Sequence, residues 1–478
     1  MRILVVLLFF WASAAGAQAW DPKPWVDDLH QMRSAIDEKY ANLDWLKEER
    51  EVDLDALFTR VEGRLRSAGS DAAARAVLDR LVDRIGDGHV ALNWPAAKST
   101  GPAAPPPPPV PGAAGLCGRL GYDARQSSPG FTPLLTGYRA LPSANAFPAG
   151  LVSVGAKKLG LLRIGVFQPQ GSPALCEAAV SALTIAPDKP CDEICEDKIL
   201  TWVYRRMTSD LAVRADQLKA AGADALLVDI SGNGGGSEWA EAAARILSPV
   251  PLRSGERGFV RGEHWAKQWR ELAERLRSAA KEASPADRAR LLAWAAEADR
   301  GVAEAERRCP PGCPRIARLG YATGLVGAAP AGSFDGKPWA VHIFSIAQFP
   351  YRDSAWKGPL IVAADQETWS AAEEFAALLQ DNRAAIVLGA RTGGAGCGHT
   401  WGGTPTVLTN SGATLELPDC VRFRADGSNE VRGILPDLAI PVRGNDGRAF
   451  AAHLFEAALP AAIAKAEALG SGGTDAER

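Results

Sequence analysis

Short, compact runs of apolar residues constrain the fold of this chain more than any other feature. They lie at residues 159–166, 225–229, 361–364 and 385–388, and the last three are each followed by glycine-rich or helical sequence. Apolar runs without alternation are typical of strands that are buried on both faces of a parallel sheet. Strands that alternate with helices in this way indicate an α/β fold. We therefore expect an α/β core over residues 151–445.

A small helical domain is expected ahead of this core, over residues 20–94. Apolar side chains recur at helical spacing in three stretches, at residues 28–40, 53–65 and 70–85. Ser70 and Asp71 are good N-cap residues for the third helix, and Gly86 stands where a helix commonly ends.

The remaining segments differ in composition from the core. Residues 95–150 form a proline-rich linker, with five consecutive prolines at 105–109, and a short irregular segment. Two charged amphipathic stretches at about 260–315 predict a helical hairpin inserted into the core. Residues 446–478 are expected to form a C-terminal helix and tail.

The first 19 residues predict a secretory signal peptide. Arg2 supplies a positive charge, residues 3–11 are apolar, and Ala17 and Ala19 form a small-residue cleavage site. This apolar stretch is shorter than the about 20 residues of a membrane anchor; an uncleaved anchor is the alternative. We expect a secreted or periplasmic mature protein, without a membrane partner, in an oxidising compartment.

Charge and motif content exclude some functional classes. The 53 lysine and arginine residues against 56 aspartate and glutamate residues give a net charge of −3, so no nucleic-acid partner is expected. The glycine-rich loop at residues 232–236 lacks the fingerprint of a dinucleotide- or phosphate-binding loop. No cofactor and no metal are predicted.

Two sites next to predicted helices could carry chemistry. The backbone N–H groups of Gly234 and Gly235 could hold an oxyanion, although an ordinary tight turn is an equally good interpretation. Ser370 precedes a predicted helix at residues 371–379. A serine there is a favoured N-cap, but it would also gain as a nucleophile from the nearby N–H groups.

Two histidines and one glutamate are candidates for proton transfer. His89 and His399 both lie in glycine-rich settings, so they compete as the base. A lone histidine is nevertheless more often a surface or packing residue. An exposed glutamate is usually just solvated, and this is the simplest interpretation of Glu430. It could also orient a histidine as the third member of a triad.

Six short motifs follow one another along the chain: Asp87 with His89, Asp229 with Asn233 and Gly236, Ser370 with Glu373, Asp381 with Ala384, Gly389 with Thr392, and Gly433 with Ile434, Pro436 and Asp437. In this order they resemble the C-terminal-processing (tail-specific) serine peptidases and their tricorn-type relatives. The resemblance covers about residues 25–95 and 155–445, apart from the helical insertion. It implies a ClpP/crotonase-like core and hydrolysis of peptide bonds without a metal.

The resemblance implies roles for single residues. Ser370 aligns with the family nucleophile, and the N–H groups of Ala371 and of Gly234 or Gly235 would form the oxyanion hole. Tail-specific members use a Ser–Lys dyad, but Ala395 stands where their lysine falls. A Ser–Lys mechanism is therefore not expected.

Tricorn-type members instead use a histidine from the N-terminal region and a glutamate ahead of the last motif. His89 and Glu430 stand at those places, which implies a triad with Ser370. The tricorn-type pattern also has a serine just before the histidine, where this chain has Gly88. The resemblance thus predicts a serine endopeptidase that acts on polypeptides through an acyl-enzyme.

Two alternatives stay open at this point. The chain could be a non-catalytic ligand- or peptide-binding module of the same fold, or a serine hydrolase that uses His399 as its base. Many family members also carry a PDZ module, but the stretch between the proline run and the core is short for one and has no carboxylate-binding loop. No PDZ domain is therefore predicted.

The eight cysteines are an even number, which suits an oxidising compartment. The candidate disulfides are Cys309–Cys313 and Cys191–Cys195, which would close small loops, Cys397–Cys420, which would flank a predicted hairpin at 401–418, and Cys117–Cys176, which would pair by elimination.

Overall fold

The computed structural model describes residues 20–96, 110–142, 146–308 and 313–471, so the predicted signal peptide lies outside the described residues. The α-helices are α1 (Lys23–Lys39), α2 (Leu54–Arg66), α3 (Asp71–Ile85), α4 (Gly112–Arg119), α5 (Pro173–Ala182), α6 (Glu193–Ala220), α7 (Trp239–Leu247), α8 (Glu263–Glu282), α9 (Pro285–Glu306), α10 (Ala371–Asp381) and α11 (Arg448–Ser471). The strands are β1 (Ala91–Asn93), β2 (Arg139–Ala140), β3 (Ala149–Val154), β4 (Lys157–Arg163), β5 (Ala225–Asp229), β6 (Glu256–Val260), β7 (Ile316–Tyr321), β8 (Leu360–Ala364), β9 (Ile386–Gly389), β10 (Thr406–Val407), β11 (Thr414–Glu416), β12 (Cys420–Phe423) and β13 (Leu438–Ala439).

A seven-stranded sheet forms the centre of the molecule, in the order β13-β9-β8-β5-β4-β3-β2. Strands β4, β5, β8, β9 and β13 pair in parallel, whereas β2 and β3 add an antiparallel edge. The four apolar runs of the sequence lie at β4, β5, β8 and β9. The predicted α/β fold class is confirmed.

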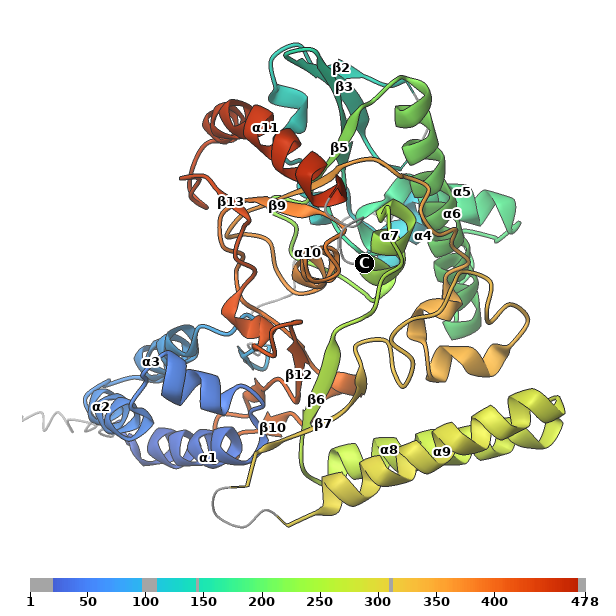
Figure 1. Cartoon of the computed structure of the whole chain (residues 1–478). Helices are drawn as coiled ribbons and strands as arrows, with labels where there is room; N and C mark the ends of the chain where they lie inside the picture. Colours follow the sequence, from blue (N-terminus) through green and yellow to red (C-terminus); the bar gives the residue numbers. More distant parts are fainter. Residues whose placement is uncertain (1–19, 97–109, 143–145, 309–312, 472–478) are drawn as a thin grey trace, which may run out of the picture.

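Helices cover both faces of this sheet, and its middle strands are mostly apolar. In β5, Val228 packs on one face with α5, α6, α7 and α10, and Leu227 packs on the other face with α11. Helix α11 is the one helix of the described residues that is long and apolar enough to cross a membrane, by length and composition only. In the structure its buried side chains, such as Phe455 and Leu459, lie against the sheet (Figure 1).

The N-terminal helices form a separate apolar cluster that joins the core through a small sheet. α1, α2 and α3 pack around residues such as Leu29, Phe58 and Leu78. Strand β1, which follows α3, pairs antiparallel with β11 in the three-stranded sheet β1-β11-β10. Figure 1 shows the three blue helices beside the orange β10 and β12 strands. This pairing ties the start of the chain to the loop region that follows β9.

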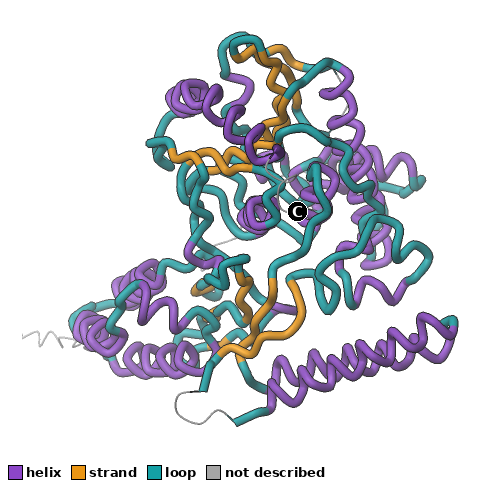
Figure 2. The backbone as a smooth tube through the Cα atoms, in the orientation of Figure 1, coloured by secondary structure: helices purple, strands orange, loops and turns teal. Residues whose placement is uncertain are grey.

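The inserted segment is a long antiparallel pair of helices, α8 and α9. It is inserted between strands β6 and β7, whose residues Val260 and Ile316 pair directly. Figure 1 and Figure 2 show the two helices side by side, away from the central sheet. The first turn of α8 touches the loop after β9, because His264 lies 3.0 Å from the carboxylate of Asp419 and from the carbonyl oxygen of Thr400.

Six of the seven described cysteines are joined as Cys117–Cys176, Cys191–Cys195 and Cys397–Cys420. The predicted pair of Cys309 with Cys313 cannot be described, because Cys309 lies outside the described residues. The segment expected to be irregular before the core contains a helix, α4. Its Cys117 is buried and bonded to α5, and this crosslink holds the short helix against the core.

Candidate active site

Ser370 stands at the N-terminus of α10 in a strained backbone conformation. Its φ is 55° and its ψ is −118°, a region that non-glycine residues seldom occupy. Such a conformation costs on the order of 1–3 kcal/mol and persists only where its surroundings hold it. Here the Ser370 N–H donates to the Glu373 carboxylate at 2.9 Å, and the preceding Trp369 N–H donates to the Asn233 carbonyl at 3.0 Å. The sharp turn presents the serine side chain at the end of strand β8.

The glycine-rich loop after β5 lies against this serine, because β5 and β8 are parallel neighbours and end at the same edge. A Cβ on Gly235 would come within 2.8 Å of the Ser370 Cβ, so only glycine fits there. The Gly235 N–H is taken by the Asn233 side-chain oxygen at 2.8 Å, so the expectation that it could form the oxyanion hole is wrong. Within the described residues, the N–H groups of Gly234 and Ala371 have no hydrogen-bond partner.

His89 comes from the opposite end of the sequence and meets Ser370 directly. Its Nε2 lies 3.0 Å from the Ser370 Oγ, and its Nδ1 lies 2.9 Å from the Ala395 carbonyl oxygen. A carbonyl only accepts, so Nδ1 carries the proton of a neutral imidazole and Nε2 is left to accept the Ser370 hydroxyl. This is the tautomer that a general base requires. Burial, and to a smaller extent the positive charge of Arg422, lowers the pKa of His89 to about 4.

A buried carboxylate fixes the turn that carries His89. Asp87 accepts the His89 N–H at 3.0 Å, the Tyr40 hydroxyl at 2.9 Å and the Asn42 side-chain amide at 2.8 Å. Burial raises the pKa of Asp87 to about 6. Asn42 in turn accepts from Asn429 at 2.7 Å, so this network joins the N-terminal helices to the core.

The glycine before the histidine has a steric reason. A Cβ at Gly88 would meet the Trp369 ring at 2.6 Å and the Ala395 Cβ at 3.2 Å. The serine of the tricorn-type pattern would therefore displace the residue next to Ser370. Where the tricorn-type pattern has the hydroxyl group of that serine, this structure has tight packing between the turn of His89 and the turn of Ser370.

Glu373 links the serine to the loop that orients the histidine. Its buried carboxylate accepts from the Ser370 N–H, the Gly394 N–H at 2.7 Å, the Ala395 N–H at 2.8 Å and the Thr392 hydroxyl at 2.5 Å. Burial raises the pKa of this carboxyl. Because the Ala395 carbonyl accepts from His89, one side chain holds both members of the reacting pair in place.

The structure places the other predicted residues differently. Glu430 does not contact His89; both of its oxygens accept from Arg422, at 2.9 and 2.5 Å, so its expected place beside the imidazole is wrong. His399 lies edge-on to His89, with 5.9 Å between ring centroids. No hydrogen bond joins His399 to Ser370 within the described part of the chain.

The family model for "Peptidase family S41" matches residues 198–440, which is about half of the chain. The chain belongs to peptidase family S41. It is therefore a serine-type peptidase, as the tail-specific and tricorn-like motifs predicted.

Solved structures with the fold of this S41 peptidase include two of mature CPAF. One has a TM-score of 0.58 at 15% identity and covers 95% of this chain and 98% of that chain. The other, a complex with lactacystin, has a TM-score of 0.59 at 15% identity, with 94% and 99% covered. A putative peptidase from Parabacteroides merdae gives 0.45 at 15% identity, with 93% and 98% covered. No curated protein sequence matches the chain.

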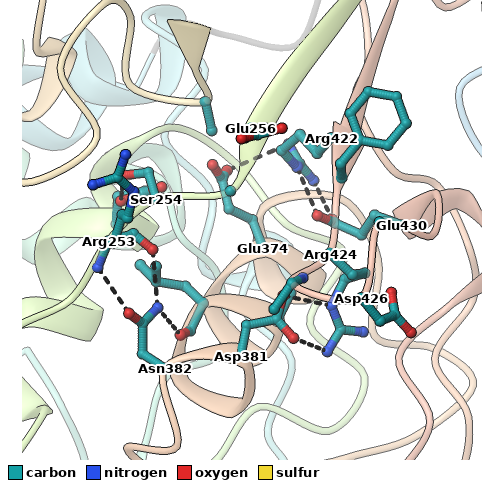
Figure 3. A pocket seen from close by; sticks show the side chains of 18 of the residues that line it. Arg253, Ser254, Glu256, Glu374, Asp381, Asn382, Arg422, Arg424, Asp426 and Glu430 are labelled. Carbon is teal, nitrogen blue, oxygen red and sulfur yellow. Dashed lines mark hydrogen bonds and ion pairs between the residues drawn. The ribbon is translucent and has the colours of Figure 1, made fainter. Parts of the chain in front are cut away.

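A charged cavity of about 530 Å³ lies beside the candidate active site of this S41 peptidase (Figure 3). Its lining includes Glu241, Glu374, Arg422 and Glu430. Burial raises the pKa of Glu374 to about 8. Arg422, which was not predicted from the sequence, reaches from this wall to the backbone of the candidate active site. In the sequence, Arg422 is a single arginine in a short strand, and no pattern around it predicts its hydrogen-bond partners.

The part of the chain that the structure describes contains no group of three or more histidine, cysteine, aspartate or glutamate residues that could hold a metal ion.

Proposed function

We propose that this S41 peptidase is a secreted or periplasmic serine endopeptidase, with Ser370 as its nucleophile and His89 as its base. The observation that carries the proposal is the 3.0 Å approach of the His89 Nε2 to the Ser370 Oγ at a strained, helix-capping turn. A structural N-cap serine has no need of a positive φ or of a histidine partner. The three described disulfides support an extracytoplasmic location.

The proposed reaction is acyl transfer. His89 takes the hydroxyl proton as the Ser370 Oγ attacks the scissile carbonyl. The N–H groups of Gly234 and Ala371 stabilise the resulting oxyanion. His89 then gives the proton to the leaving amine. A water molecule that His89 activates hydrolyses the acyl-enzyme, which releases the carboxylic acid product and returns a proton to the Ser370 Oγ. The Ala395 carbonyl, rather than a carboxylate, orients the imidazole throughout.

Several properties of the site suit this role. The low pKa of His89 keeps its imidazole neutral at pH 7, as a base must be. Gly234 is exposed while Gly235 is buried, so a substrate oxygen can reach the Gly234 N–H. We also propose that residues 20–94 supply the base to a peptidase core at 151–445, which is interrupted by the hairpin of α8 and α9.

Turnover of an unstructured protein tests the proposal. The purified mature chain should degrade fluorescently labelled casein, and Ser370→Ala should reduce the rate at least about 10³-fold. Ser67→Ala, on an exposed helix end, is the matched control and should keep the wild-type rate. Equal degradation by Ser370→Ala and the control would refute the nucleophile. Binding of peptides without turnover by the wild type would favour a non-catalytic module instead.

A further inference from the structure

Arg422, on strand β12, has a buried guanidinium group that two carboxylates surround. Glu430 accepts from its Nε and Nη2, at 2.9 and 2.5 Å, in a bidentate pair. Glu374 lies 3.4 Å from Nη1. Figure 3 shows these three side chains at one end of the cavity, with the arginine between the two acids. Only 11% of the Arg422 side chain and 4% of the Glu430 side chain are exposed, so water screens this pair little.

The same guanidinium reaches the backbone of the proposed active site. Its Nη2 donates to the Ser370 carbonyl at 3.3 Å and to the Gly396 carbonyl at 2.9 Å. Ser370 carries the nucleophile, and Gly396 directly follows the residue whose carbonyl orients His89. One side chain therefore ties the turn of the serine to the loop that holds the histidine.

The Ser370 turn needs such a tie because its backbone is strained. The Ser370 N–H is held by Glu373, and the Ser370 carbonyl accepts from the Glu374 N–H at 3.0 Å and from Arg422. Glu373 and Glu374 lie on α10, directly after Ser370, whereas Arg422 lies on β12 and so connects the serine turn to another part of the fold. Without Arg422, Ser370 and the loop at 394–396 would still be joined through the side chains of Glu373 and His89, but no side chain of the described residues would hold the Ser370 carbonyl.

We propose that Arg422 is a positioning residue of this peptidase, and that Glu430 serves the reaction through Arg422 rather than through His89. Glu430 fixes the direction of the planar guanidinium, which only a bidentate partner can do. Arg422 then fixes the Ser370 and Gly396 carbonyls and adds a positive charge near the imidazole. This inference rests on the proposed function of Ser370 and His89.

The test compares fluorophosphonate labelling of Ser370, as a function of pH, in three variants of the full mature chain. Glu430→Gln removes the bidentate carboxylate and keeps the arginine charge. Arg422→Met with Glu430→Gln removes both charges of the bidentate pair together. Glu374 also loses its contact with Arg422, but burial raises its pKa to about 8, so its carboxyl group is mostly protonated at pH 7. Asp381→Asn is the matched control, because its partner Arg424 lines the same cavity but has no contact with the active-site backbone.

We expect labelling at pH 7 to fall at least tenfold in Glu430→Gln and in the double variant, and less than twofold in Asp381→Asn. The pH at which labelling is half-maximal should rise only in the double variant, because only there is the Arg422 charge lost. The rise should be partial, because burial, the larger cause of the low His89 pKa, remains. A purely structural ion pair would change the unfolding midpoint but would not slow the labelling of Ser370 in a folded Glu430→Gln protein.

Wild-type labelling rates in Glu430→Gln would overturn the inference, and so would an unchanged titration in a folded double variant. Should the double variant fail to fold, the rate of the isosteric Glu430→Gln decides alone. A wild-type protein that is never labelled at Ser370 would instead refute the proposed function, so the two failures are distinguishable.

Discussion

At the scale of single residues, the site depends on three small or strained positions packed against one another. Ser370 adopts a positive φ, Gly235 lets the β5 loop approach it, and Gly88 lets Trp369 pack beneath the turn of His89. A Cβ at either glycine would overlap a neighbouring residue. The geometry of the proposed catalytic pair is therefore set by backbone packing as much as by hydrogen bonds.

Gly88→Ala tests this packing. Its Cβ would lie 2.6 Å from the Trp369 ring, and relief of that overlap should lower the free energy of unfolding by about 1–3 kcal/mol. It should also slow labelling of Ser370. Gly63→Ala is the control, since nothing lies within 4 Å of its Cβ, and it should stabilise α2 by about 0.5–1 kcal/mol. Equal behaviour of both variants in urea denaturation would contradict the packing argument.

At the scale of elements, the loop from β9 to β12 carries most of the groups that orient the pair. The Cys397–Cys420 disulfide closes this loop next to Ala395 and Arg422. Cys397→Ala with Cys420→Ala should lower the free energy of unfolding by about 3 kcal/mol, because the open loop gains conformational entropy when unfolded. Labelling of Ser370 should slow as well, as the Ala395 carbonyl loses its fixed position.

The bond between Cys191 and Cys195 provides the matched control for that loss. Its two cysteines are only four residues apart in the sequence, and Cys195 lies in the first turn of α6. Its removal should cost about 2 kcal/mol by the same entropy argument and leave labelling unchanged. Slower labelling in this control would show that general loosening, rather than the loop beside the site, limits the reaction.

Most helices and strands could be predicted from the sequence, whereas the side-chain contacts between distant elements could not. Strands β5 and β8 are buried on both faces, so each is an unbroken apolar run in the sequence. Helix α6 was missed, although Ile199, Val203 and Met207 recur every four residues on its buried face. The carboxylate of Glu430 could not be assigned, because the choice between His89 and Arg422 depends on where β12 lies, which no local pattern encodes.

At the scale of the whole molecule, the proposed base and nucleophile come from regions 281 residues apart. They meet because β1, two residues after His89, pairs with β11 of the core. The network of Asp87, Tyr40 and Asn42 strengthens this junction from inside. A catalytic pair built across two parts of the fold depends on their docking as well as on each part.

Asp87 should make the stability of this junction depend on pH. Burial raises its folded pKa to about 6, above the ordinary value near 3.9. The folded state therefore favours the protonated form, and this stabilisation is complete below about pH 4 and lost as pH rises through about 6. The difference in unfolding free energy between wild type and Asp87→Asn should fall by up to about 3 kcal/mol from pH 4 to pH 7. A constant difference in urea denaturation would contradict the buried carboxylate.

The most direct test of the central claim is to label the purified mature protein with a fluorophosphonate and to map the adduct by peptide mass spectrometry. We predict one adduct per chain, on Ser370, absent in Ser370→Ala, strongly slowed in His89→Ala and unchanged in His399→Ala. An adduct on another serine, or normal labelling of His89→Ala, would contradict the proposed pair of Ser370 and His89.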